Sequence, residues 1–248
     1  MTDMKTRLPM MSEMRKKHLT QLRKNQADSA RDKTGTASNS LAGTLRFLAV
    51  SEFVLNQDKR TFVENLVEAA TLRRNLIERF EAGEDISPSY VSMMSYKSLM
   101  DALAAGDVQA AKDIAAKMGG RSSIESEYDR PFDLAFGYAL KHIVLSDVDS
   151  VGQWLDALEV ASKDPENKDF AGYAKMLKAI VDKDVPQANA ALSDVVAGHK
   201  RQCTGKGLCK DTEDELLCVW GVAVANLARM HGVQVDPIEP LIPRDLLV

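Results

Sequence analysis

The chain has 248 residues, of which 45% are hydrophobic, an ordinary composition for a protein with a packed core. Its formal net charge is −4, from 36 acidic and 32 basic side chains. Binding to nucleic acid requires a clustered basic face, so this balance argues against nucleic acid as a direct partner. The sequence also lacks a run of about 18 consecutive apolar residues, so we expect no membrane partner.

Residues 1–40 are polar and basic, and they contain no apolar run that could form the core of a signal peptide. The three cysteines of the chain all lie near its C-terminal end, which is not the pattern of a secreted disulfide scaffold. We therefore expect a cytoplasmic protein. We interpret residues 1–40 as an N-terminal arm that is partly helical or flexible, with residues 34–40 forming a loop.

Residues 41–248 are expected to form a single all-α domain. Apolar side chains recur at helical spacing, for example Phe62, Leu66, Leu76 and Phe80, and alternating runs of β-branched residues are scarce. Glycines just past such runs predict helix ends, because glycine adopts the left-handed conformation of a C-cap at little cost. These glycines are Gly83, Gly119, Gly120, Gly198 and Gly232. We predict a compact array of roughly ten helices.

Helix starts are marked by capping residues. The pairs at residues 87–88 and 164–165 place a capping side chain before a proline at the first helical position. Thr212 and Glu215 have the spacing of a capping box, which predicts a helix that begins there. At the other end of that helix, His231 lies in the last turn, where a protonated imidazole would interact favourably with the helix dipole.

A weak internal repeat relates residues 99–111 to residues 176–188, and similar joints occur around Asp58 and Asp147. Each joint is predicted to contain the end of one helix, a short turn, an aspartate cap and the start of a second helix. Stacked helical hairpins of the tetratricopeptide kind use this pattern. Because the spacing between the joints is irregular, we predict helical hairpins within one compact array rather than a regular solenoid.

Common catalytic and cofactor motifs are missing from the sequence. Residues 204–207 offer a Gly-Lys pair but lack the upstream glycine and the following Ser or Thr of a phosphate-binding loop. Serine-hydrolase and zinc-protease signatures do not occur, and no histidine follows a glutamate at the spacing of a di-iron bundle. We therefore predict a protein that is not an enzyme and has no cofactor.

One group of residues has partial metal-binding character. His199 and Cys203 are four residues apart, which places both on one face of a helix, and a loop could return Cys209 to them. The spacing of the two cysteines is wider than in the usual zinc knuckle, so we favour ordinary thiols over a metal site. Zinc binding and a disulfide between Cys203 and Cys209 stay open as alternatives.

Acidic side chains cluster at three places, within residues 81–85, 125–129 and 211–215. Acids in the first turn of a helix are expected from the helix dipole alone, but an acidic patch can also steer a basic partner into position. The candidate partner-binding residues are Asp211, Glu213, Asp214, Glu81, Glu84 and Asp85.

The C-terminal third resembles the immunity protein 49 family of bacterial polymorphic-toxin systems. The resemblance rests on the acidic lead-in, the small-residue helix at residues 216–229, the stop at residues 231–232 and the ending at residues 242–247. It implies a cytoplasmic, non-catalytic protein that binds and neutralises a cognate toxin protein. Two rival interpretations are a helical-repeat adaptor that binds a protein or peptide, and a small metal-binding protein that uses His199, Cys203 and Cys209.

Overall fold

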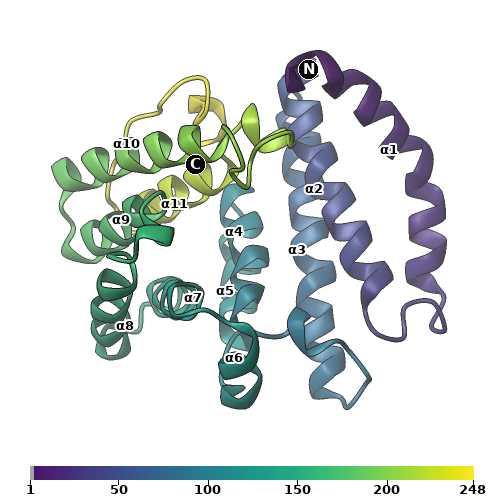
Figure 1. The fold of residues 1–248 in the computed structure, drawn as a ribbon, viewed down its shortest axis with the longest axis horizontal. Helices are drawn as coiled ribbons and strands as arrows, with labels where there is room; N and C mark the ends of the chain where they lie inside the picture. Colours follow the sequence, from purple (N-terminus) through teal and green to yellow (C-terminus); the bar gives the residue numbers. More distant parts are fainter. Residues whose placement is uncertain (1–2) are drawn as a thin grey trace.

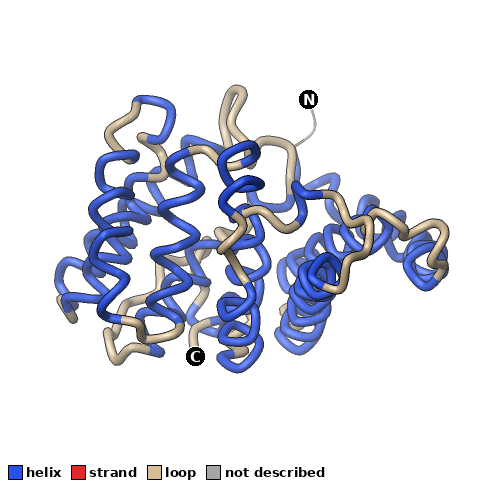
Figure 2. The backbone as a smooth tube through the Cα atoms, turned by 90° about the horizontal axis from the view of Figure 1, so that it is seen from below, coloured by secondary structure: helices blue, strands red, loops and turns tan. Residues whose placement is uncertain are grey.

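The computed structural model describes residues 3–248, and within them the regular structure is helical (Figures 1 and 2). The all-α prediction is confirmed, with eleven α-helices in the described residues. They are α1 (Met4–Ala27), α2 (Thr36–Asn56), α3 (Lys59–Glu81), α4 (Tyr96–Ala104), α5 (Val108–Lys117), α6 (Ser122–Tyr128), α7 (Pro131–Val144), α8 (Val148–Ala161), α9 (Ala171–Asp182), α10 (Val185–Gln202) and α11 (Val219–Met230). The 3-10 helices are η1 (Pro88–Tyr90), η2 (Met93–Ser95), η3 (Pro165–Asn167), η4 (Glu213–Glu215) and η5 (Arg244–Leu246). Among residues 3–248, no helix has both the length and the apolar character needed to cross a membrane.

Three long helices, α1 to α3, form one half of the molecule, with α1 at its outer edge (Figure 1). Met4 and Leu8 of α1 are buried against Phe47 and Leu48 of α2. The basic N-terminal arm therefore contains a helix that packs on the rest of the array. The division predicted at residue 40 lies inside α2.

The loop predicted at residues 34–40 is wrong beyond Gly35, because α2 begins at Thr36. The reason is a buried aspartate that organises this helix start. Asp32 accepts hydrogen bonds from the backbone N–H of Ser38 (2.8 Å) and from the guanidinium of Arg79 on α3 (2.6 Å). The start of α2 is thus capped by Asp32, which is itself held by Arg79, 47 residues further along the chain.

The second half contains α7 to α11, and α4 and α5 lie between the two halves (Figure 1). An aromatic cluster packs the elements around the junction. The ring of Tyr96 lies 5.1 Å from that of Phe136 and 5.7 Å from that of Trp220, and Tyr173 lies 5.6 Å from Phe136. Edge-to-face aromatic pairs of this kind add stabilisation beyond the area that they bury.

Four helix joints share one local design. The aspartates Asp58, Asp107, Asp147 and Asp184 each accept a hydrogen bond from the backbone N–H three residues later, at 3.0, 2.9, 3.3 and 2.9 Å respectively. Each aspartate follows a residue with positive φ: Gln57 (54°), Gly106 (74°), Ser146 (56°) and Lys183 (58°). The left-handed residue reverses the chain and the aspartate caps the next helix. The predicted pattern of helix, turn, Asp cap and helix is confirmed at all four joints.

Most of the predicted glycine stops are confirmed, and one is wrong. The confirmed ones have positive φ and follow a helix end: Gly83, Gly119, Gly120 and Gly232. Gly198 instead lies inside α10. A Cβ atom at this position would stand 1.9 Å from the carbonyl oxygen of Asp169. Gly198 is therefore a point of close approach between α10 and the segment before α9.

The predicted helix starts are only partly correct. The prolines at residues 88 and 165 begin 3-10 helices instead of α-helices. The capping box at Thr212 and Glu215 is wrong, because α11 begins at Val219. The Glu215 carboxylate turns back and accepts hydrogen bonds from the backbone N–H of Asp211 (2.7 Å) and from the Lys210 ammonium (2.8 Å). The acidic run thus closes a loop and does not open the last helix.

His231 lies at the C-cap of α11, but its surroundings oppose a positive charge there. Burial lowers the pKa of this imidazole, and the nearby ammonium groups of Lys183 and Lys112 lower it further, against one backbone hydrogen bond that raises it. The folded protein therefore favours the neutral form, in contrast to the cation expected from the helix dipole.

This arrangement predicts a stability that depends on pH. Since the folded-state pKa of His231 lies below the unfolded value of about 6.5, the contribution is present above that pH and is lost as the pH falls. The free energy of unfolding, measured with urea, should fall between about pH 7.5 and about pH 5.5 in the wild type. We expect it to fall less in His231→Gln. Part of the dependence should remain, because burial also lowers the pKa of His199. An unchanged slope in the variant would contradict this assignment.

Candidate functional site

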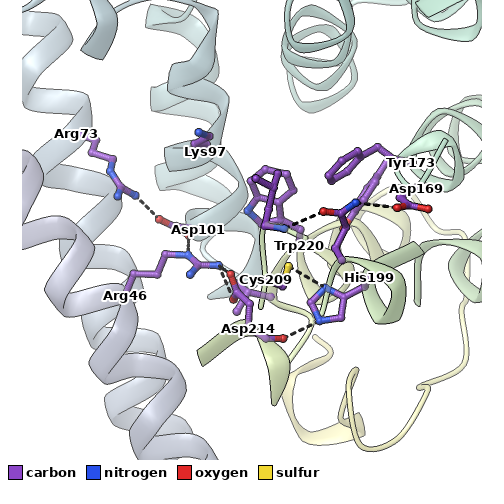
Figure 3. Close-up of a pocket in the computed structure, with 14 residues that line it drawn as sticks. Arg46, Arg73, Lys97, Asp101, Asp169, Tyr173, His199, Cys209, Asp214 and Trp220 are labelled. Carbon is purple, nitrogen blue, oxygen red and sulfur yellow. Dashed lines mark hydrogen bonds and ion pairs between the residues drawn. The ribbon is translucent and has the colours of Figure 1, made fainter. Parts of the chain in front are cut away.

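A cavity of about 360 Å³ lies at the junction of the two halves (Figure 3). Its walls come from α2, α3 and α4 on one side and from α9, α10, α11 and the segment before η4 on the other. The lining residues are Arg46, Arg73, Lys97, Asp101, Asp169, Phe170, Tyr173, His199, Gln202, Leu208, Cys209, Asp214, Val219 and Trp220. Aromatic and charged side chains therefore share one concave surface, as is common in binding sites.

Four lining residues belong to a network of five charged residues that we call the Arg46 clasp: Arg46, Arg73, Asp101, Glu213 and Asp214. The Arg46 guanidinium donates to Asp101 (3.2 Å), Glu213 (2.9 Å) and Asp214 (2.9 Å). The Arg73 guanidinium donates to the second oxygen of Asp101 (2.7 Å). The clasp thus connects α2, α3 and α4 to η4.

The clasp holds its charges in a largely dry environment. The Asp101 side chain is 1% exposed and that of Arg46 is 15% exposed. Burial alone lowers the pKa of Arg46, but the surrounding carboxylates of Asp214, Asp101 and Glu213 outweigh burial and raise this pKa above its ordinary value. Burial also raises the pKa of Asp101, although both guanidinium groups oppose that shift. Each charge in the clasp is therefore stabilised only by the presence of the others.

The two acidic patches that supply the candidate partner-binding residues are both paired within the chain. In the first, Glu213 and Asp214 belong to the Arg46 clasp, and Asp211 lies 3.2 Å from the Arg7 guanidinium of α1. In the second, the ion pairs are Glu81 with Arg121 (2.5 Å), Glu84 with Arg79 (2.7 Å) and Asp85 with Lys33 (3.2 Å). These six carboxylates connect elements of the fold through ion pairs.

Lys97 of α4 differs from the other cations that line the cavity. Within residues 3–248, it forms no ion pair and no side-chain hydrogen bond, whereas both arginines bind Asp101. Burial lowers the pKa of its ammonium group, Asp133 raises it, and Arg73 lowers it again. Opposite Lys97 stand the rings of Trp220 and Tyr173 (Figure 3). The cavity therefore offers one available positive charge beside an aromatic wall.

The three residues with metal-binding character do come together. A nitrogen of His199 and the sulfur atoms of Cys203 and Cys209 all lie within 4.8 Å of one another. The Cys209 sulfur lies 3.8 Å from Nδ1 of His199. All three cysteines are free thiols, and Cys218 is buried apart from this group. His199, Cys203 and Cys209 thus form one cluster in the structure.

The sequence did not reveal the cationic part of the cavity. Arg46, Arg73 and Lys97 stand on three different helices, so no local motif connects them. One signal was present, because Arg73 interrupts the apolar stripe of the helix at residues 59–81. A charge on a buried helix face needs a buried partner, which here is Asp101.

Comparison with known proteins gives no assignment for this chain. No family model matches it, and no curated protein and no solved structure matches it either.

Proposed function

We propose that this protein is a non-catalytic immunity protein that binds a toxin protein and neutralises it. The proposal follows from the resemblance of the C-terminal third to such proteins. The single observation that supports it most is the cavity at the junction of the two halves, where Lys97 has no partner among residues 3–248 and lies beside Trp220 and Tyr173. Protein interfaces concentrate their binding energy in central pockets that receive one or a few anchor side chains.

The chemistry of the cavity indicates what the toxin would insert. A volume of about 360 Å³ accommodates a side chain or two, and not a folded segment. Because the arginines are already neutralised by Asp101 and Asp214, the free ammonium of Lys97 is the group that attracts a ligand. We expect an acidic side chain, flanked by apolar atoms that contact the aromatic wall. The acidic patches, by contrast, are already paired within the chain and leave fewer charges for a basic partner.

The test is co-purification with the product of the neighbouring reading frame, combined with growth of cells that express that product with and without this chain. A stable complex and rescued growth are expected. The Lys97→Glu variant should weaken binding by about 30-fold or more, because reversing the charge removes a pair and adds repulsion. Lys112→Glu changes an exposed lysine of α5 outside the cavity; it is the matched control and should bind as the wild type does.

Wild-type affinity in the Lys97→Glu variant would remove the cavity from the proposal. Circular dichroism of both variants shows whether the folded state is intact.

A second candidate, a helical-repeat adaptor, is favoured by the four equivalent Asp-capped joints. A complex with the neighbouring product in the absence of any toxicity would support the adaptor. If no complex forms and the neighbouring product is not toxic, the immunity proposal is contradicted.

A further inference from the structure

The loop between α10 and η4 is built to bring Cys209 back to the end of α10. The backbone N–H of Cys209 donates to the carbonyl oxygen of Gln202 (3.1 Å), and the Cys209 carbonyl accepts from the Thr212 hydroxyl (2.7 Å). The Gln202 side chain also accepts from the backbone N–H of Leu208 (2.9 Å). The position of Cys209 is therefore fixed from both sides along the backbone.

Gly207 permits this return of the chain. A Cβ atom at this position would lie 2.2 Å from the Gln202 carbonyl oxygen and 2.6 Å from its Cα atom, so no larger residue fits without moving the loop. The end of α10 is anchored in turn, because Asp169 accepts hydrogen bonds from Arg201 (2.5 Å) and Gln202 (2.8 Å). Loop and helix end thus form one rigid frame around the two thiols.

The His199 ring is oriented as metal-binding imidazoles usually are. Its Nε2 lies 2.7 Å from the backbone carbonyl oxygen of Asp214, and a carbonyl oxygen can only accept, so Nε2 carries the proton. The lone pair of Nδ1 is then free, and Nδ1 is the atom that lies 3.8 Å from the Cys209 sulfur (Figure 3). A second-shell carbonyl that fixes the tautomer in this way is a regular feature of histidine ligands.

We propose that His199, Cys203 and Cys209 bind one zinc ion. Two thiolates and one imidazole nitrogen are the ligands that zinc prefers, and three protein ligands leave its fourth tetrahedral position open. His199 and Cys209 also line the cavity, so the proposed ion lies at the cavity wall. Binding of Zn²⁺ displaces the protons of the two thiols, which pass to the solvent. The site does not depend on the proposed toxin-binding function.

The test uses the full chain, purified without a histidine tag, loaded with zinc and then passed over a chelating resin. Elemental analysis is expected to find one zinc ion per chain. The variants Cys203→Ser, Cys209→Ser and His199→Gln should each retain less than about a tenth of this amount. Cys218→Ala removes a buried thiol outside the cluster and should retain the full amount. Equal zinc content in all five proteins, or none in the wild type, would overturn the proposal.

Three further measurements separate the loss of zinc ligands from misfolding and from disulfide formation. Cobalt(II) added to the wild-type protein should give thiolate charge-transfer bands and the intense visible bands of a tetrahedral site, both lost in Cys209→Ser. Gly207→Ala keeps all three ligands but displaces the loop, so it should release zinc to the resin.

A thiol titration that finds only Cys218 reactive in the denatured, unreduced and metal-free protein would instead show a disulfide between Cys203 and Cys209. All of these measurements are made without a partner protein. Their outcome therefore tests the zinc site independently of the toxin-binding proposal.

Discussion

Asp101→Ala is expected to reduce the free energy of unfolding by about 3–5 kcal/mol. The Asp101 carboxylate is 1% exposed and lies between the guanidinium groups of Arg46 (3.2 Å) and Arg73 (2.7 Å). Removing it leaves Arg73 without its ion-pair partner next to a second positive charge, and both side chains are too enclosed for full hydration. Urea unfolding followed by circular dichroism measures the effect.

Asp113→Ala provides the matched control for this variant. Asp113 is a carboxylate on the neighbouring helix α5, where it is 44% exposed and 3.7 Å from Arg74. Exposed ion pairs contribute little, so we expect a change within about 0.5 kcal/mol. A loss below about 1 kcal/mol in Asp101→Ala would show that Arg73 finds another partner and that the Arg46 clasp is not a structural requirement.

Gly198→Ala is expected to destabilise the protein by about 3 kcal/mol, at the upper end of the usual cost of overpacking. The added methyl group would lie 1.9 Å from the Asp169 carbonyl oxygen, a backbone atom that cannot rotate away. Helix α10 must therefore move outward, and the contacts between Asp169 and the Arg201 and Gln202 side chains are strained with it. Thermal or urea unfolding reports the loss.

Gly152→Ala is the control for helix propensity. Gly152 lies inside α8, and a Cβ atom there would meet nothing within 4 Å. Alanine should stabilise this position by roughly 0.5–1 kcal/mol, because glycine is the more flexible residue in a helix. The two substitutions are chemically the same, so opposite signs would assign the effect of Gly198→Ala to the close approach alone. Equal signs would contradict that assignment.

The parts of the fold that could be predicted are those fixed by near neighbours in the sequence. An aspartate cap such as Asp107 acts on the N–H three residues later, so its role is visible in a short window. The same holds for Gly83 and Gly232, whose positive φ ends a helix locally. His199 and Cys203 share a helix face for the same reason, and this made part of the zinc cluster visible.

The features that escaped prediction depend on partners far along the chain. A glycine at position 198 is typical of a helix C-cap. Only its close approach to the Asp169 carbonyl oxygen shows that glycine is needed there for packing. The acidic run at residues 211–215 suggested an open surface, whereas Arg46 and Arg7 of the N-terminal half neutralise most of it. No local pattern carries such pairings.

The Arg46 clasp has a thermodynamic consequence. It joins residue 46, residue 101 and residues 213–214 around one cavity, so the cavity exists only when both halves of the chain are folded together. A ligand that occupies the cavity therefore binds the native state alone and stabilises it by linkage, by about 2.7 kcal/mol at a concentration one hundred times its Kd. The melting temperature of the whole molecule thus reports occupancy, even for a ligand of unknown identity.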